Sequence, residues 1–219
     1  MLLQSPLLRF TLLLIAFLPL LLSAQADKGM SLLSKGNPAA AEAAFRADLD
    51  NPKEAPLAMY GLSLVFADAR FERRQIDTAF VFIENCDKAY RKMPPELKSK
   101  IVKQLTSAMI ADQRKAVIDK AFARAKELAT VQGYEFFLEN FPKPLTKLKR
   151  AALAERNSLA LQQAKASGKS SEVQTVLDRY GSSMATDSPN LLAEAQRALF
   201  QFYKNKKGWN AFAEFKSAY

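Results

Sequence analysis

Few side chains in this chain are suited to catalysis, and the first candidate nucleophile is a single thiol. The 219 residues include one cysteine, Cys86, and no histidine. Cys86 therefore lacks the imidazole base that commonly activates such nucleophiles, and the chain lacks the commonest metal ligand. One cysteine also excludes an intramolecular disulfide and a multi-cysteine zinc site. Cys86 lies on an apolar helical stripe, so we expect a small buried hydrophobe, with an intermolecular disulfide as the alternative.

Carboxylates are the next candidates, because a pair facing each other across a cleft would suit glycoside hydrolysis. No spacing marks such a pair, and solvated helix faces account for the scattered acids, which include Glu42, Asp48, Asp50, Glu54, Asp68, Asp77, Glu84, Asp119, Glu135, Glu139, Glu155 and Glu194. The sequence contains neither a glycine-rich phosphate loop nor a calcium loop of EF-hand spacing. We therefore expect a protein that is not an enzyme and that uses no cofactor or metal.

The first 26 residues are typical of a cleavable secretory signal. They carry one base, Arg9, and no acid, and an apolar run over 10–22 follows that base. Ala24 and Ala26 then place small residues at the −3 and −1 positions before Asp27, which predicts cleavage after Ala26. An uncleaved anchor is the weaker alternative, since Pro19 interrupts a run shorter than the ~20 residues that span a bilayer. We expect a periplasmic or envelope-associated protein with no transmembrane span after cleavage.

The rest of the chain has the pattern of an all-α protein. Glycine and proline fall at intervals, as in Gly36-Asn37-Pro38, and apolar residues recur between them at helical spacing. One such stripe contains Ala79, Phe82, Ile83, Cys86 and Tyr90, and another contains Tyr134, Phe137, Leu138 and Phe141. We also expect Tyr60, Phe71 and Phe136 to pack in the core rather than to contact a ligand.

The C-terminal half matches itself twice at a shift of 39 residues. Phe122 aligns with Leu161 and Phe200, and the same register holds for Tyr134, Val173 and Phe212, for Phe137, Val176 and Phe215, and for Phe141, Tyr180 and Tyr219. This period predicts three units, over 112–141, 151–180 and 190–219, each with a long helix, a turn and a shorter helix. Such units bury their apolar faces against their neighbours.

The N-terminal part resembles a tetratricopeptide repeat (TPR). The residues that carry this resemblance are Gly29, Leu32, Leu33, Gly36, Asn37, Ala41, Ala44, Phe45, Leu49 and Pro52, with a degenerate second copy in Ala58, Gly61, Leu62, Val65, Ala79, Ile83 and Pro94. The motif from Tyr134 to Pro142 also resembles helical repeats of bacterial cell-envelope proteins. The resemblance implies a right-handed stack of antiparallel helical hairpins, a TPR-like α-solenoid. We expect a signal peptide over 1–26, TPR-like repeats over 27–94, and continuous repeats of 39-residue period over 95–219.

A stack of hairpins presents an extended concave surface, so we expect a scaffold that binds a protein or peptide partner. The candidate groove residues lie off the apolar stripe on the first helices of the units: Lys120, Arg124, Arg156, Gln163 and Arg197. A helical accessory part of a cell-wall enzyme is a further alternative.

The basic residues support a different hypothesis. The formal net charge is +10, and Lys126, Lys165 and Lys204 share one register, so stacking would line them along one edge. A solvated lysine edge near helix C-termini is the simpler interpretation. The alternative is an electrostatic binder of an anionic envelope component, such as lipopolysaccharide, a lipid headgroup or peptidoglycan. Nucleic acid is not an expected partner, because the predicted location lies outside the cytoplasm.

Overall fold

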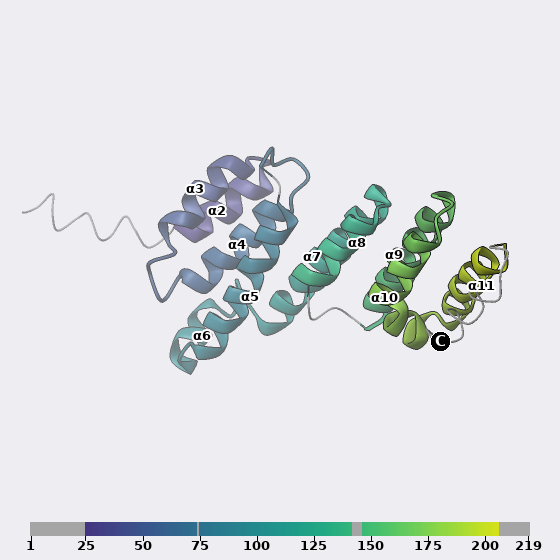
Figure 1. Ribbon diagram of the computed structural model, residues 1–219. Coiled ribbons are helices and arrows are strands. Elements are labelled where there is room, and N and C mark those ends of the chain that lie inside the picture. Colours follow the sequence, from purple (N-terminus) through teal and green to yellow (C-terminus); the bar gives the residue numbers. More distant parts are fainter. Residues whose placement is uncertain (1–24, 74, 142–145, 206–219) are drawn as a thin grey trace, which may run out of the picture. The chain divides into compact units, whose positions relative to one another are not determined.

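The computed structural model describes residues 25–73, 75–141 and 146–205, and within these ranges the protein is all-helical. It contains ten helices there and no strand (Figure 1), which confirms the predicted all-α class. The apolar run and Ala24 of the predicted signal lie outside the described residues, as do Pro142 and the second helix of the last predicted unit. In the described ranges no helix is both long and apolar enough to cross a membrane.

The chain divides into two compact units, and the first ends at Lys120. Its helices are α2 (Gln25–Ser34), α3 (Pro38–Ala47), α4 (Ala55–Ala67), α5 (Ile76–Lys92), α6 (Pro95–Ile101) and the first part of α7 (Ser107–Leu128). The contacts run from each helix to the next along α2, α3, α4 and α5, and α2 also contacts α4.

The turn between α2 and α3 shows how local sequence sets the helix ends. Gly36 adopts a φ of +78°, a left-handed conformation that glycine adopts without steric cost. The N–H groups of Gly36 and Asn37 donate to the carbonyls of Leu33 and Leu32, which closes the end of α2. Asn37 then caps α3, because its Oδ1 accepts from the Ala40 N–H at 3.1 Å, and Pro38 occupies the first helical position.

The core of the first unit contains an aromatic ring held between two glycines. Phe45 of α3 is fully buried, and a Cβ added at Gly29 of α2 would lie 2.6 Å from its ring. A Cβ added at Gly61 of α4 would lie closer still. The two glycines therefore let both α2 and α4 lie close to the Phe45 ring.

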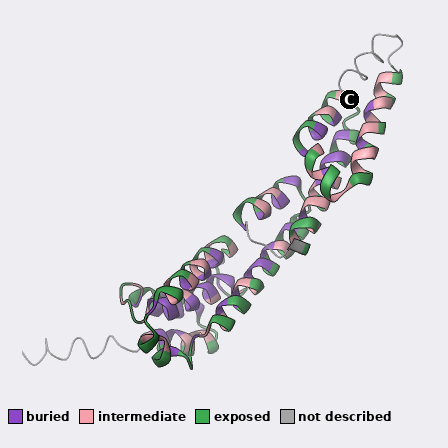
Figure 2. Ribbon diagram, turned by 90° about the horizontal axis from the view of Figure 1, so that it is seen from below, coloured by how far each residue is buried: buried purple, intermediate pink, exposed green. Residues whose placement is uncertain are grey.

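The second unit begins at Ala121, inside α7, and continues through α8 (Val131–Asn140), α9 (Thr146–Ala166), α10 (Ser170–Asp187) and α11 (Pro189–Asn205). Here α9 contacts α8, α10 and α11, and α10 contacts α11. Its buried cluster includes Leu161, Val173, Met184, Ala195 and Leu199. Figure 2 shows the buried residues along one side of these helices and the exposed residues along the other.

Several positions that the proposed 39-residue period aligns are buried to a similar degree. Tyr134 and Val173 are both buried, as are Phe137 and Val176. The second helices differ in length, however, because α8 has 10 residues whereas α10 has 18 and runs through Gly181 to Asp187. The period and the solenoid remain predictions. The division between compact units, at 120/121, also falls later than the change of repeat type expected at 94/95.

Candidate functional site

A cavity of about 240 Å³ lies in the second unit, where α8, α9 and α10 meet. Its lining residues come from all three helices: Val131, Gln132, Ala160, Gln163, Ala164, Glu172, Thr175, Val176, Arg179 and Tyr180. Five of these residues are buried: four aliphatic residues and the aromatic Tyr180. The other five are exposed and polar. The cavity therefore has an apolar floor and a polar rim.

The composition of the rim follows from helical spacing. Val176 and Tyr180 lie four residues apart on the buried side of α10, and Thr175 and Arg179 occupy the exposed positions just before them. Small residues, Ala160 and Ala164, form the α9 part of the floor. Because alanine leaves space that a longer side chain would fill, this face of α9 remains hollow.

The aromatic floor residue is held by a polar network. The Tyr180 hydroxyl donates to Glu135 Oε1 at 2.7 Å, and Arg179 pairs with the same carboxylate at 2.8 Å. The guanidinium of Arg156 lies 4.3 Å from the Tyr180 ring centroid. Burial, followed by the hydrogen bond to Glu135, raises the pKa of Tyr180 above its ordinary value. The network thus holds the phenol as a neutral donor at one wall of the cavity.

Of the predicted groove residues, only Gln163 lines this cavity, where it is exposed at the rim. Arg124 is exposed on α7 and pairs with Glu127 of the same helix at 3.2 Å. Arg197 is exposed on α11, and its Nε donates to the Ala193 carbonyl of its own helix. The structure therefore does not bring these three residues together at one cavity.

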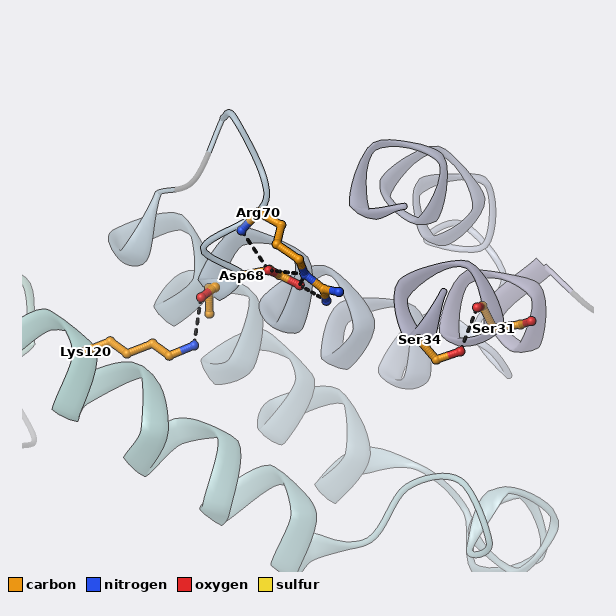
Figure 3. Close-up of polar contacts among 6 residues, drawn as sticks. Ser31, Ser34, Asp68, Arg70 and Lys120 are labelled. Carbon is orange, nitrogen blue, oxygen red and sulfur yellow. Dashed lines mark hydrogen bonds and ion pairs between the residues drawn. The ribbon is translucent and has the colours of Figure 1, made fainter. Parts of the chain in front are cut away.

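Two predicted groove residues are held by contacts within their own unit. Lys120 belongs to the first unit, where its Nζ donates to the Ala67 carbonyl at 2.8 Å, beside the Asp68–Arg70 ion pair (Figure 3). Arg156 is half-buried and donates to Asn157 and Ser183. Arg156 was expected to be a groove contact. Its guanidinium also contacts Ser183 of α10, and a groove contact for Arg156 remains a prediction.

The three lysines of the predicted edge all lie in the last turn of their helices, α7, α9 and α11. Lys126 and Lys204 are exposed, but Lys165 pairs with Glu194 of α11 at 2.7 Å. A carboxylate therefore neutralises the middle position of the edge.

The other candidates from the sequence are mostly buried. Cys86 is inaccessible and its thiol donates to the Pro56 carbonyl at 3.2 Å, while burial raises its pKa to about 12. The expectation of a buried cysteine is therefore confirmed, and the thiol is not poised for disulfide exchange in the folded chain. Tyr60 and Phe71 are buried as expected, but the expectation for Phe136 was wrong, because this side chain is 51% exposed on α8.

Within the described ranges, no group of three or more Cys, Asp and Glu residues is placed to hold a metal ion. Comparison of the chain with family models, with curated proteins and with solved structures finds no match.

Sequence reasoning missed most of the cavity, because it assigned the groove to the first helices of the units. Gln132 lies on α8, and Thr175 and Arg179 lie on α10, which are second helices in that scheme. The signal in the sequence was the pairing of apolar positions on α10, such as Val176 and Tyr180, with a polar residue directly before each. That signal occurs on every amphipathic helix, so it does not single out a site.

Proposed function

We propose that this chain is an exported helical-repeat scaffold, TPR-like in plan, that binds a protein segment at the cavity between α8, α9 and α10. The observation that carries the proposal is the combination of an apolar floor with a neutral polar rim. Of the rim residues, Glu172 and Arg179 carry opposite charges, and Gln132, Gln163 and Thr175 are uncharged. A rim of this kind offers hydrogen bonds without requiring a charged ligand.

The rim chemistry suits a peptide backbone. A glutamine amide both donates and accepts hydrogen bonds, as a peptide group does, and Gln132 and Gln163 supply one each from two helices. The volume, about 240 Å³, lies below the ~300–1,000 Å³ of pockets that hold whole small-molecule ligands. The cavity therefore suits one or two apolar side chains of an extended or helical segment.

The repeat pattern in the sequence supports the proposed stack of helical units. Some residues in the same register of the proposed 39-residue period are buried in both of the first two copies, as with Tyr134 and Val173. Stacked units leave a continuous surface on which further contacts can follow the first. Export is proposed from the signal-like residues over 1–26, with cleavage after Ala26, which would remove the first two residues of α2 and leave the rest of that helix in the mature chain.

A non-enzymatic role fits the cavity lining. Glu172 is the only carboxylate among the described lining residues. Glu135, which Arg179 and Tyr180 contact, lies outside the lining. A pair of facing carboxylates, which glycoside hydrolysis uses, would need a second acid across the cavity. The electrostatic alternative, binding of an anionic envelope component by the lysine edge, rests on Lys126 and Lys204 once Lys165 is paired.

A peptide display experiment tests the proposal with two matched variants. Thr175 and Thr186 are both exposed on α10, and each hydroxyl donates to the carbonyl four residues before it. Thr175 lines the cavity and Thr186 does not. A random peptide library selected on the full mature chain should enrich segments with an apolar anchor. Their Kd should rise at least about tenfold in Thr175→Arg, where the long side chain blocks the rim, and stay within about twofold in Thr186→Arg.

The same peptides should bind with similar affinity at low and high salt, because the rim is neutral and screening acts on net exposed charge. Selection that enriches no peptide above a blank support would overturn the proposal, as would enriched peptides that bind Thr175→Arg as well as wild type. Enrichment of acidic peptides alone, with binding lost at high salt, would favour the electrostatic alternative instead.

A further inference from the structure

A second and larger cavity lies in the first unit, far in sequence from the proposed peptide site. Its volume is about 400 Å³, and it opens where α5, α6 and α7 meet. Its lining residues are Asp87, Tyr90, Arg91, Lys98, Ser107, Ala111 and Arg114. Three cations and one carboxylate give this lining a formal charge of +2.

The carboxylates of Asp87 and Glu84, near the cavity, already form hydrogen bonds with arginines. Asp87 accepts from Arg91 Nε at 3.0 Å and from Arg114 Nη2 at 2.9 Å, and Glu84 accepts from Arg114 Nε at 2.5 Å. Arginine–carboxylate bonds of this kind fix the guanidinium groups in place. The two arginines are therefore positioned before any ligand arrives, which lowers the entropic cost of binding.

Lys98 is the cation of this lining that pairs with no carboxylate among the described residues. Its ammonium donates to the Arg91 carbonyl at 3.2 Å and lies 5.4 Å from the Tyr90 ring centroid. In the described ranges Lys98 forms no ion pair with a carboxylate. Since an ammonium has three N–H donors, Lys98 retains donors for a ligand.

The surrounding sequence strengthens the positive potential. Residues 88–103 contain six basic side chains, Lys88, Arg91, Lys92, Lys98, Lys100 and Lys103, against one acid, Glu96. The cavity also includes Ser107, the first residue of the 22-residue helix α7. The N-terminal end of a helix carries a partial positive charge that adds to the field of these cations.

We propose that this cavity binds a phosphate monoester group, carried by a soluble ester or by a lipid. A phosphate monoester has three acceptor oxygens and a charge of about −1.5 to −2 at pH 7, so it offers more acceptors to Lys98 and the two guanidinium groups than a carboxylate does. Guanidinium and ammonium donors are the groups that proteins use to bind phosphate oxygens. The volume falls within the ~300–1,000 Å³ typical of ligand pockets. Tyr90 and Ala111 provide an apolar wall for the carbon part.

Calorimetry with glycerol 3-phosphate tests the proposal on the full mature chain, with glycerol as the uncharged comparison. Ala111→Glu places a carboxylate in the cavity, whereas Ala123→Glu makes the same change at another exposed alanine of α7. The two positions are about 18 Å apart along the helix axis, beyond the ~8–10 Å screening length at moderate salt. We expect glycerol 3-phosphate, but not glycerol, to bind wild type, with Kd raised at least about tenfold in Ala111→Glu and within about twofold in Ala123→Glu.

Vesicles identify the source of the phosphate group. Binding to vesicles that contain phosphatidic acid, but not to phosphatidylcholine vesicles, would assign the site to a lipid headgroup when glycerol 3-phosphate itself binds weakly. Binding of the soluble ester without vesicle binding would assign it to a free metabolite. Either result supports the proposal, provided that Ala111→Glu weakens the binding.

Two results would overturn the proposal. One is the absence of binding by both probes at millimolar concentration, and the other is equal binding by wild type and Ala111→Glu. If circular dichroism shows that Ala111→Glu is misfolded, the α6 pair Lys98→Gln and Lys100→Gln replaces it, because Lys98 lines the cavity and Lys100 does not. Lys98→Gln must then bind the probe at least about fivefold more weakly than Lys100→Gln does, and equal affinities would refute the site.

Discussion

Among individual residues, Asp48 is the buried carboxylate whose partners are incomplete. Its side chain is 1% exposed at the C-cap of α3, and among the described residues Oδ2 has no hydrogen-bond partner. Burial raises its pKa above the ordinary 3.8, although the backbone N–H of Ala26 partly opposes this. A negative charge is also unfavourable at the C-terminal end of a helix. The ionised form of Asp48 therefore destabilises the fold.

Asp48→Asn should raise the free energy of unfolding at pH 7 by about 1 kcal/mol, because it removes a buried charge. The folded pKa lies above the unfolded one, so the folded wild-type chain binds the proton more tightly. The contribution of Asp48 to the stability of the folded chain therefore falls as the pH rises above 3.8. Urea unfolding should show the largest difference near neutral pH and little difference near pH 3.

Asp50→Asn is the control for this measurement, since Asp50 is exposed two residues away. It should change the stability by less than about 0.5 kcal/mol. An Asp48→Asn chain that is less stable than wild type at pH 7 would show that the carboxylate makes contacts stronger than its burial cost.

At the scale of helices, the packing of α2, α3 and α4 depends on the Phe45 ring between Gly29 and Gly61. The ring is fully buried, and a Cβ added at either glycine would lie within 3 Å of the same ring atoms. These glycines are among the residues that carry the TPR resemblance, and in this fold they allow close helix approach. Their conformational freedom is not what the packing uses, because neither has a positive φ.

Gly61→Ala should destabilise the chain by about 1–3 kcal/mol, the usual cost of overpacking a core, despite the higher helix propensity of alanine. Gly181→Ala is the matched control, since Gly181 lies inside α10 and a Cβ added there would meet no atom within 4 Å. That change should stabilise the chain by up to about 1 kcal/mol. Thermal unfolding of both variants measures the contrast, and equal shifts would disprove the role of Phe45 in excluding a Cβ at Gly61.

At the scale of the whole molecule, each compact unit has its own buried core. Leu199 is fully buried in the second unit and Ile83 is fully buried in the first. Because the two cores belong to separate compact units, damage to one core should remain local.

Leu199→Ala should cost about 2–5 kcal/mol of local stability, the typical range for a buried leucine truncation. Native-state hydrogen exchange should then show faster amide exchange in α9, α10 and α11, with little change in α4 and α5. Ile83→Ala should give the opposite pattern. A uniform loss of protection along the chain in either variant would show that the two cores unfold as one cooperative unit.

The sequence alone determined the helical class, the buried faces of several helices and some of their ends. These features are local. Residues such as Ala79, Ile83 and Cys86 recur at the spacing of one helix face, and Gly36 and Asn37 close one helix and start the next through bonds to nearby residues. The identity of the neighbouring helix is not needed for either prediction.

Only the tertiary structure decided which polar residues surround a cavity. Lys120 and Gln163 both lie off the apolar stripe of a long helix, yet Lys120 bonds to Ala67, which is 53 residues away, whereas Gln163 remains exposed at a cavity rim. Spacing along one helix shows that a side chain points away from its own apolar face. Which atoms it then contacts depends on helices that are distant in sequence, and their packing is a nonlocal property.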